Sequence, residues 1–320
     1  MTNEFLLIDR LQKIKQIISK YGEENFYLSF SGGKDSTVLS ALVDLAVPGN
    51  KIPRVYANTG IEYHLILDFV EREREKPHPW ELVILKPSTP IKPTLEEVGY
   101  PFKSKEHAQR WREFEKYGAD QKHVQRYLGL YRRPRDTDEI LQWHSCPKIL
   151  RFQFTEEYRE NGLKISDLCC NKMKEEPLEK WQAENKKPYA LVGIMRAERG
   201  RRTHAQCLTF QKDGNLKKFQ PLVAISKEWE EWFIESHGIE ISDIYKPPYN
   251  FDRTGCKGCP FALGLQHELD TLERFFPEER RQCETIWKPV YDEYRRLNYR
   301  LKANRQMEIK DFMKGEEDGI

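Results

Sequence analysis

The chain has 320 residues, of which 38% are hydrophobic, 12% aromatic and 32% charged, with a formal net charge of +2. This length and apolar content allow one large domain or two smaller ones with a true core. The near-zero net charge excludes a general electrostatic argument for nucleic-acid or membrane binding. The first residues are acidic rather than basic and lack an apolar signal core, and no apolar run approaches membrane length, so we expect a cytoplasmic protein with no membrane partner.

In chain order, apolar residues at helical spacing predict a first helix that ends at Gly22. The apolar and aromatic run 26–30 predicts a strand, and residues 37–43 predict the helix that follows it. Further strands are expected at 52–58, 81–86 and 189–194, with a helix over 62–73. Ser226 can cap a tryptophan-containing helix that ends near Gly238. This alternation predicts an α/β fold with a parallel, doubly wound sheet, whose ligands bind beyond the carboxyl ends of the strands.

The turn between the first strand and the following helix has the sequence Ser31-Gly32-Gly33-Lys34-Asp35-Ser36. Two consecutive glycines permit positive φ angles and a close approach of the backbone to a ligand. The start of the following helix attracts anions through its unpaired N–H groups and its dipole. The spacing is not that of a Walker loop. A flexible surface turn is the alternative, but the strand–turn–helix context favours a phosphate site.

Residues 102–135 differ in composition from the rest of the chain, because basic and aromatic side chains are interleaved there. The basic residues are Lys103, Lys105, Arg110, Arg112, Lys116, Lys122, Arg126, Arg132, Arg133 and Arg135, and the aromatic ones are Trp111, Tyr117, Tyr127 and Tyr131. Such a helical insertion, at about 100–150, can bind polynucleotide phosphates and stack on bases. The alternative, which the lack of a motif favours, is a solvated helical hairpin whose aromatic rings pack on the sheet.

We expect residues 1–262, with this insertion, to form the main nucleotide-binding domain, and residues 263–320 to form a helical C-terminal extension packed on it. The sequence from Phe275 onward is expected to be helical.

The seven cysteines are an odd number, which argues against a disulfide framework in a cytoplasmic protein. Cys169 and Cys170 are adjacent, whereas Cys256 and Cys259 form a C-x2-C knuckle with glycines before and within it. Four thiolates from two distant pairs can close a zinc site or bind an iron–sulfur cluster. Adjacent side chains diverge, which favours a cluster, with zinc as the alternative. The simplest interpretation leaves Cys169 and Cys170 as core thiols.

These motifs together resemble known families. The glycine turn resembles the PP-loop of the ATP pyrophosphatase superfamily, whose members bind nucleotides and commonly split ATP between its α- and β-phosphates. With both cysteine pairs, and with the lysines and proline that follow the first pair, the chain resembles the phosphoadenosine phosphosulfate (PAPS) reductase family over about residues 24–98 and 165–262. The adenylyl-sulfate reductase branch uses this cysteine arrangement for a [4Fe-4S] cluster. The resemblance therefore implies such a cluster on Cys169, Cys170, Cys256 and Cys259.

Two shorter stretches extend the resemblance. Residues 56–60 are similar to the family's strand that ends in Asp-Thr-Gly, with Asn58 in place of the acid. Residues 193–198, with Arg201 and Arg202 after them, are similar to its Gly-Ile-Arg-Ala-Glu segment and its arginines.

The resemblance and the chemistry together imply roles for the matched residues. Ser31, Gly32, Gly33, Asp35 and Ser36 are expected to cradle phosphates, with Lys34 as a point charge beside them. The segment Ala57, Asn58, Thr59 and Gly60 is expected to meet the adenosine. Arg196, Arg201 and Arg202 are expected to neutralise a pyrophosphate or a sulfonate, with surface solvation as the alternative. Candidate catalytic residues are Lys34, Asp35, Arg196 and Arg201.

One departure from the family bears on the reaction. Its sulfonucleotide reductases attack sulfur with a cysteine in a C-terminal Glu-Cys-Gly motif, whereas here the last cysteine is Cys283. A covalent thiosulfonate is therefore not expected at the usual place. Cys283, Cys207 and Cys146 are the candidates to replace that thiol.

We therefore expect a PP-loop enzyme that adenylates an acceptor with ATP and then transfers sulfur to it, similar to the DNA phosphorothioation sulfurtransferases. Mg²⁺ is expected with the triphosphate, although the sequence shows no dedicated site for it. A nucleic-acid acceptor would bind through residues 103–135, and a sulfur donor or partner subunits are expected. The alternatives are a sulfonucleotide reductase, which binds an adenylyl sulfonucleotide and uses a relocated thiol, and a non-catalytic nucleotide-binding subunit of a modification or defence complex.

Overall fold

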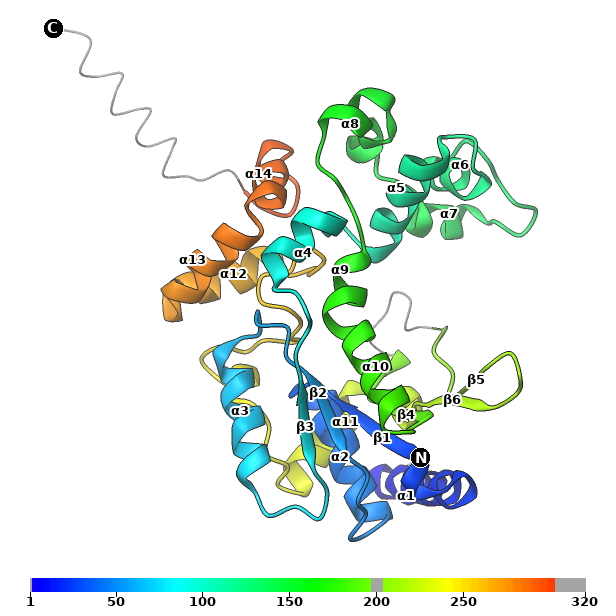
Figure 1. Cartoon of the computed structure of the whole chain (residues 1–320), viewed down its shortest axis with the longest axis vertical. Helices are drawn as coiled ribbons and strands as arrows, with labels where there is room; N and C mark the ends of the chain where they lie inside the picture. The colour runs from blue at the N-terminus through cyan, green and yellow to red at the C-terminus, as the bar shows by residue number, and fades with distance from the viewer. Residues whose placement is uncertain (1, 197–203, 303–320) are drawn as a thin grey trace, which may run out of the picture. The chain divides into compact units, whose positions relative to one another are not determined.

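The computed structural model describes residues 2–196 and 204–302, so the candidate residues Arg201 and Arg202 lie outside the described part of the chain. By its packing the chain divides into two compact units (Figure 1). Unit 1 comprises Met1–Ser88 and Met173–Thr254, and unit 2 comprises Thr89–Lys172 and Gly255–Ile320. The expected division into residues 1–262 and 263–320 stays a prediction about folding domains.

Unit 1 is built on a six-stranded sheet with the strand order β3-β2-β1-β4-β6-β5. Its strands are β1 (Phe26–Phe30), β2 (Arg54–Ala57), β3 (Leu82–Leu85), β4 (Tyr189–Val192), β5 (Leu208–Phe210) and β6 (Leu216–Phe219). All neighbouring pairs are parallel except β5 with β6, which is antiparallel. The four expected strands are present. The edge hairpin of β5 and β6 was not expected, because its short strands are largely polar or exposed and lack a clear apolar pattern.

Four helices of unit 1 begin and end close to the positions that the sequence predicts, namely α1 (Asn3–Tyr21), α2 (Lys34–Ala46), α3 (His64–Glu75) and α11 (Lys227–Ser236). Helix α10 (Glu176–Glu184) was not expected. Gly22 ends α1 at a positive φ of 81°. The side chain of Ser226 caps α11 by accepting a hydrogen bond from the backbone N–H of Trp229 at 3.2 Å.

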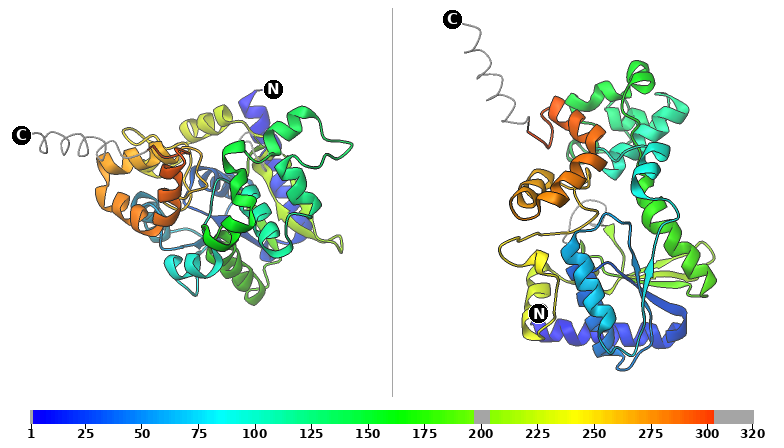
Figure 2. Two further views of the ribbon diagram at one scale, coloured as in Figure 1. Left: turned by 90° about the horizontal axis from the view of Figure 1, so that it is seen from above. Right: turned by 60° about the vertical axis from the view of Figure 1, so that its left-hand side comes forward.

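The two faces of the sheet are covered by different helices, which confirms the doubly wound α/β class. Tyr27 of β1 contacts Trp181 of α10, with their ring centroids 5.7 Å apart. Phe30, three residues further along the strand and therefore on the other face, contacts Phe69 of α3, with centroids 6.5 Å apart. Accordingly, α10 and α3 lie on opposite sides of the strands (Figures 1 and 2).

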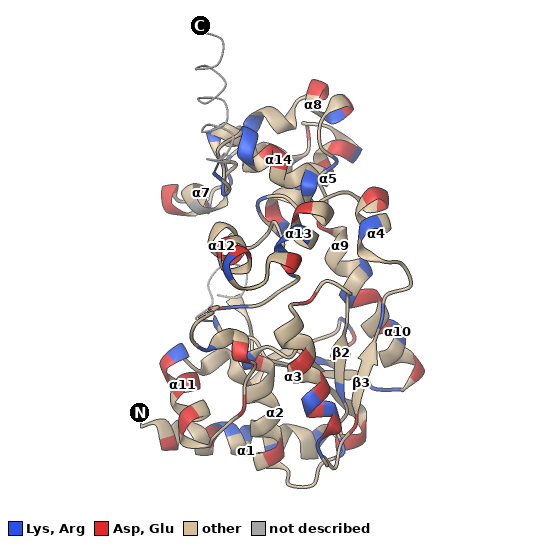
Figure 3. Cartoon of the chain, turned by 90° about the vertical axis from the view of Figure 1, so that its left-hand side faces the viewer, with Lys and Arg blue, Asp and Glu red and all other residues tan. Residues whose placement is uncertain are grey.

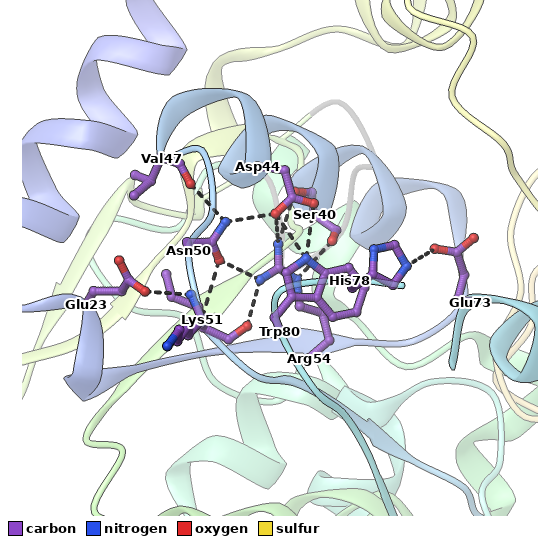
Figure 4. A network of polar contacts seen from close by, with 11 residues as sticks. Glu23, Ser40, Asp44, Val47, Asn50, Lys51, Arg54, Glu73, His78 and Trp80 are labelled. Atoms are coloured by element: carbon purple, nitrogen blue, oxygen red, sulfur yellow. Dashed lines mark hydrogen bonds and ion pairs between the residues drawn. The ribbon is translucent and has the colours of Figure 1, made fainter. Parts of the chain in front are cut away.

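A buried arginine joins α2 to the sheet. The side chain of Arg54 in β2 is fully buried and donates to Oδ1 of Asp44 at 2.7 Å, to Oδ1 of Asn50 at 2.8 Å and to Oγ of Ser40 at 3.0 Å (Figure 4). Its guanidinium also lies over the ring of Trp80, 4.3 Å from the centroid. Burial lowers the pKa of Arg54 to about 10, although the charge of Asp44 and its hydrogen bond act to raise it. Because Ser40 and Asp44 belong to α2, this network holds the helix that follows the glycine turn against β2.

Unit 2 is helical in its described part. The insertion contributes α4 (Ile91–Val98), α5 (Lys105–Tyr117), α6 (Lys122–Leu128), α7 (Asp138–His144), α8 (Glu156–Asn161) and α9 (Leu168–Cys170), and the C-terminal region contributes α12 (Leu265–Phe275), α13 (Pro277–Ile286) and α14 (Lys288–Arg296). Both helical regions were expected, and the second, predicted from residue 263, begins at Leu265. Among the described residues, no helix is long and apolar enough to span a bilayer.

The basic residues of the insertion are partly neutralised within unit 2. Arg112 pairs with Asp167 at 3.0 Å and Arg126 with Asp136 at 2.7 Å. Acidic and basic residues occur together on the helices of this unit (Figure 3). Of the interleaved rings, Trp111 is fully buried. These contacts give the segment a structural role, and nucleic-acid binding through residues 103–135 stays a prediction.

Candidate functional site

The glycine turn lies at the carboxyl end of β1, where parallel α/β sheets bind their ligands. Gly32 has a positive φ of 68°. A Cβ atom at this position would lie 2.8 Å from Cγ2 of Val70 and 2.9 Å from Cγ2 of Ile66. Both the backbone conformation and the packing of α3 therefore require glycine at this position.

Side-chain hydroxyls hold the turn in this shape. Oγ of Ser36 accepts from the backbone N–H of Ser31 at 3.1 Å and donates to the carbonyl of Gly33 at 2.8 Å. Oγ of Ser31 accepts from the N–H of Gly33 at 3.3 Å. The serines of the turn therefore hold it in this shape without a ligand. Their hydroxyl oxygens accept hydrogen bonds from the backbone N–H groups of Ser31 and Gly33, which are donors that a phosphate would use.

Lys34, the first residue of α2, forms a buried ion pair with α11. Its Nζ lies 3.1 Å from Oε2 of Glu230, whose side chain is 0% exposed. Apart from its contacts with Lys34 and Asp35, the carboxylate of Glu230 has no hydrogen-bond partner among the described residues. Burial and the charge of Asp35 raise the pKa of Glu230 to about 7, against the opposing effect of Lys34. Burial by itself lowers the pKa of Lys34, but Glu230 outweighs it and the net shift is upward, so Lys34 stays protonated.

Tyr245 and Thr254 complete the surroundings of the turn. Tyr245, at the end of the 3-10 helix Asp243–Tyr245, contacts the backbone N–H of Lys34 and forms a hydrogen bond with the hydroxyl of Thr254. A Cβ atom on Gly33 would lie 3.2 Å from the Tyr245 hydroxyl. The second glycine therefore lets this tyrosine approach the start of α2.

The sequence patterns did not point to Glu230, Tyr245 or Thr254. A signal for Glu230 was present, because it lies with Trp229 and Phe233 at the spacing of the buried face of α11. A carboxylate on such a face needs a partner. Tyr245 and Thr254 carried no comparable signal, because they belong to an irregular segment.

The segment 57–60 lies at the same edge of the sheet as the glycine turn. In the parallel pairing of β1 and β2, Phe30 is in register with Tyr56, so both chains leave the sheet at the same level. The N–H and the hydroxyl of Thr59 both donate to the carboxylate of Glu62, at 3.1 and 2.7 Å. This segment is therefore ordered by its own side chains and leaves the sheet beside the turn, and its contact with adenosine stays a prediction.

The segment after β4 also approaches the start of α2. A Cβ atom on Gly193 would lie 2.9 Å from the carbonyl oxygen of Asp35, so the glycine permits this contact. Arg196, three residues further, is exposed, and its Nε donates to the carbonyl of Ala205 at 2.7 Å.

The four candidate metal-ligating cysteines all belong to unit 2. Cys169 is buried, and the other three are partly buried. The hydrogen bond with Cys170 and burial raise the pKa of Cys169 strongly, and Cys259 and Cys256 add to the effect by their charge. Burial raises the pKa of Cys259 as well, followed by the charges of Cys256 and Cys170. The two sequence-distant pairs therefore lie close enough to affect each other's pKa values.

The donor set fits an iron–sulfur cluster or zinc in its chemistry, since both are bound by four thiolates. Within residues 2–196 and 204–302, however, no group of three or more His, Cys, Asp or Glu side chains is arranged to hold a metal ion. A π-helical turn over Asn171–Glu175 directly follows the first pair, and such turns are frequent at functional sites.

The C-x2-C knuckle is held by α13 and by the residue that precedes α14. Lys257 is buried inside the knuckle and donates to Oε1 of Glu279 at 2.8 Å and to Oε1 of Gln282 at 2.9 Å. The indole N–H of Trp287 donates to the carbonyl of Lys257 at 2.9 Å. The sequence did not single out Lys257, because a lysine between two cysteines is normally a solvated loop residue.

The three thiols that were considered as replacement nucleophiles differ in exposure. Cys283 is fully buried, and burial raises its pKa to about 12. Cys146 is 2% exposed, and burial raises its pKa to about 11. Cys207 is partly exposed, and burial raises its pKa too. Nucleophilic attack requires an accessible thiolate, so the surroundings of Cys283 and Cys146 argue against that role.

Comparison with known proteins finds similar structures and one matching family model. The chain resembles the PAPS reductase from Candida auris in its phosphate complex (12% identity over 72% of this chain and 82% of that one, TM-score 0.39). It also resembles the U34-tRNA thiolase NcsA from Methanococcus maripaludis with its [4Fe-4S] cluster (14% identity over 93% of this chain and 80% of that one, TM-score 0.37). A third similar structure is the NH3-dependent NAD synthetase from Campylobacter jejuni (11% identity over 90% of this chain and 94% of that one, TM-score 0.38). At this level of similarity these likenesses carry no argument about activity.

No curated protein sequence matches the chain. The family model of the phosphoadenosine phosphosulfate reductase domain, in contrast, matches residues 25–131 and 144–262, which include the glycine turn and both cysteine pairs. The chain therefore belongs to the phosphoadenosine phosphosulfate reductase family of the PP-loop superfamily.

Proposed function

We propose that this protein is an ATP pyrophosphatase-type sulfurtransferase. In the proposed reaction an acceptor oxygen bonds to the α-phosphorus of ATP as the bond to the β-phosphate breaks and pyrophosphate leaves. A sulfide-level donor (hydrosulfide) then bonds to the activated atom of the acceptor as the bond from that atom to oxygen breaks, and AMP leaves with the oxygen. The observation that carries the proposal is the preformed turn at the carboxyl end of β1, where the position of Gly32 has no room for a side chain. Family membership supports it.

The residues around the turn have distinct proposed tasks. The N-terminus of α2 and the hydroxyls of Ser31 and Ser36 bind the phosphates, since hydroxyl groups and helix N–H groups donate hydrogen bonds to anions. Lys34 and Arg196 neutralise charge on the leaving pyrophosphate. Asp35 lies in the first turn of α2, beside the expected position of the triphosphate and its Mg²⁺. The segment 57–60 meets the adenosine.

We further propose that Cys169, Cys170, Cys256 and Cys259 hold a [4Fe-4S] cluster, with zinc as the alternative. When bound, such a cluster supplies thiophilic iron for handling sulfur. The protein's own contribution is to fix the knuckle through Lys257 and Trp287 and to shield Cys169 from water.

ATP–pyrophosphate exchange tests the adenylation step. Iron-replete protein with Mg²⁺, ATP and labelled pyrophosphate is assayed with DNA, with RNA and without acceptor. We expect exchange in at least one condition, and its loss in Gly32→Ala. Gly49→Ala is the matched control, because Gly49 has a φ of 75° but a Cβ atom there would have no neighbouring atom within 4 Å. Absence of exchange under every condition would contradict the proposal.

The family match favours sulfonucleotide reduction as the second candidate. In that case adenylyl sulfate or its 3′-phosphorylated form, with thioredoxin, should release sulfite. Because Cys207 is the partly exposed thiol of the three candidates, Cys207→Ser should abolish turnover and Cys283→Ser should not. No sulfite release from either substrate would eliminate this candidate.

A further inference from the structure

Glu230 is a buried charge at the edge of the glycine turn. Its side chain is 0% exposed and lies on the apolar face of α11, between Trp229 and Phe233 in the buried stripe. The group that faces it with opposite charge is Lys34, at 3.1 Å. Apart from its contacts with Lys34 and Asp35, its carboxylate has no hydrogen-bond partner within the described part of the chain.

Stability alone is a poor explanation for this arrangement. A buried ion pair whose remaining lone pairs are unsatisfied contributes little to folding, and apolar residues of similar volume often serve as well. Each buried polar group without a hydrogen bond in a native structure needs a specific reason. The position of the pair at the first residue of the phosphate-binding helix provides one.

The other charged and titratable groups around the pair can be named. From α2, the like charge of Asp35 raises the pKa of Glu230. From the 3-10 helix Asp243–Tyr245, the hydroxyl of Tyr245 lies close enough that the charges of Asp35 and Glu230 both raise its pKa. Asp252 acts on Lys34 and is itself paired with Lys227 at 2.7 Å. Lys34 is thus the positive group that holds Glu230 ionised, and it is also the group that incoming phosphates would attract.

We propose that Glu230 is a positioning residue that holds the Lys34 ammonium against α11, and that it takes up a proton from solvent when nucleotide phosphates draw Lys34 away. This inference rests on the proposed nucleotide-binding function. The positive charge then moves from the carboxylate to the phosphates, and the buried carboxyl becomes neutral rather than remaining an unpaired charge.

The pH dependence follows from the sign of the shift. With Lys34 in place, burial and Asp35 already raise the pKa of Glu230 to about 7. Loss of Lys34 removes the influence that lowers this pKa, so it rises further. At pH 8 Glu230 without nucleotide is about nine-tenths ionised and can take up nearly one proton, whereas at pH 6 it is about nine-tenths protonated and takes up almost none. The affinity for ATP should therefore fall by about fivefold from pH 7 to pH 8, because the protonated fraction of free Glu230 falls from one half to about one tenth.

Titration calorimetry with ATP and saturating Mg²⁺ tests the proposal. Binding is measured at pH 6 and pH 8 in pairs of buffers that differ in ionisation enthalpy, which yields the number of protons taken up. At pH 8 the wild type should take up nearly one proton more than Glu230→Gln, and at pH 6 the difference should vanish. Glu231→Gln is the matched control, because Glu231 is exposed on the same helix, and it should behave as the wild type.

The outcomes separate this inference from the proposed function. ATP binding by the wild type with the same proton uptake as Glu230→Gln overturns the role of Glu230 but leaves nucleotide binding intact. No ATP binding by the wild type overturns the proposed function itself. A merely structural Glu230 would lower the stability of the variant without changing proton uptake. If Glu230→Gln does not fold, the affinity of the wild type for ATP at two pH values tests the proposal. An affinity that is equal at pH 7 and pH 8 contradicts it.

Discussion

At the scale of single residues, Gly32 combines two constraints that can be separated by experiment. It has a positive φ of 68°, and a Cβ atom would lie 2.8 Å from Cγ2 of Val70 in α3. We expect Gly32→Ala to lower the free energy of unfolding by about 2–3 kcal/mol, because strain and crowding add. Gly49→Ala, with a φ of 75° and open space, should lose only about 1 kcal/mol. Denaturant unfolding measures both, and equal losses would show that the contact with α3 is unimportant.

A second prediction at this scale concerns Cys283. Its thiol packs against Gly258 of the C-x2-C knuckle, where a Cβ atom would lie 2.7 Å from Sγ of Cys283. Burial raises the pKa of this thiol to about 12. We therefore expect Cys283 to resist iodoacetamide in the native protein at pH 8 and to react once the protein is unfolded. Peptide mass spectrometry reads the modification, and the partly exposed Cys207 is the internal control. Rapid native labelling of Cys283 would restore it as a candidate nucleophile.

At the scale of elements, the position of α2 depends on the buried network around Arg54. Replacing this side chain by methionine removes the guanidinium donors from Asp44 and Asn50, whereas Asp44 keeps the donors of Asn50 and Trp80 (Figure 4). We expect Arg54→Met to lower the free energy of unfolding by about 2–3 kcal/mol, because a buried pair is broken while Asp44 keeps some contact with water.

The matched control for that prediction is Arg74→Met. Arg74 in α3 pairs with Glu71 at 2.6 Å, but its side chain is 52% exposed. Exposed pairs contribute less than about 1 kcal/mol, so this variant should unfold almost as the wild type does. Similar losses in the two variants would contradict the structural role of the Arg54 network.

The elements also show how far local patterns reach. Strands β1 to β4 and helices α1, α2, α3 and α11 follow from apolar periodicity and caps such as Gly22 and Ser226. The hairpin of β5 and β6 does not, because strand β5 has only three residues and is not buried. Its pairing depends on the neighbouring β4, which supplies the edge on which β6 docks.

At the scale of the whole molecule, the two proposed sites belong to different units. The glycine turn is in unit 1, whereas all four cysteines are in unit 2. We expect Cys256→Ser to lose most of the iron and the visible absorption of anaerobically purified protein while retaining ATP binding. Gly32→Ala should show the reverse, and Cys207→Ser should change neither. Iron and sulfide analysis with ATP titration measures both properties, and zinc without a chromophore in the wild type would contradict the cluster.

The sequence by itself determined the family, the α/β class, the glycine turn and the four thiols. These features depend on local chemistry, since only glycine tolerates the backbone at Gly32 and only thiolates form such a donor set. The tertiary structure alone decided what surrounds them. Glu230, Tyr245 and Lys257 reach their partners from elements that are distant in sequence or irregular, so no periodicity encodes those contacts. Burial, which sets the pKa of Glu230 and of Cys283, likewise exists only once the helices have packed.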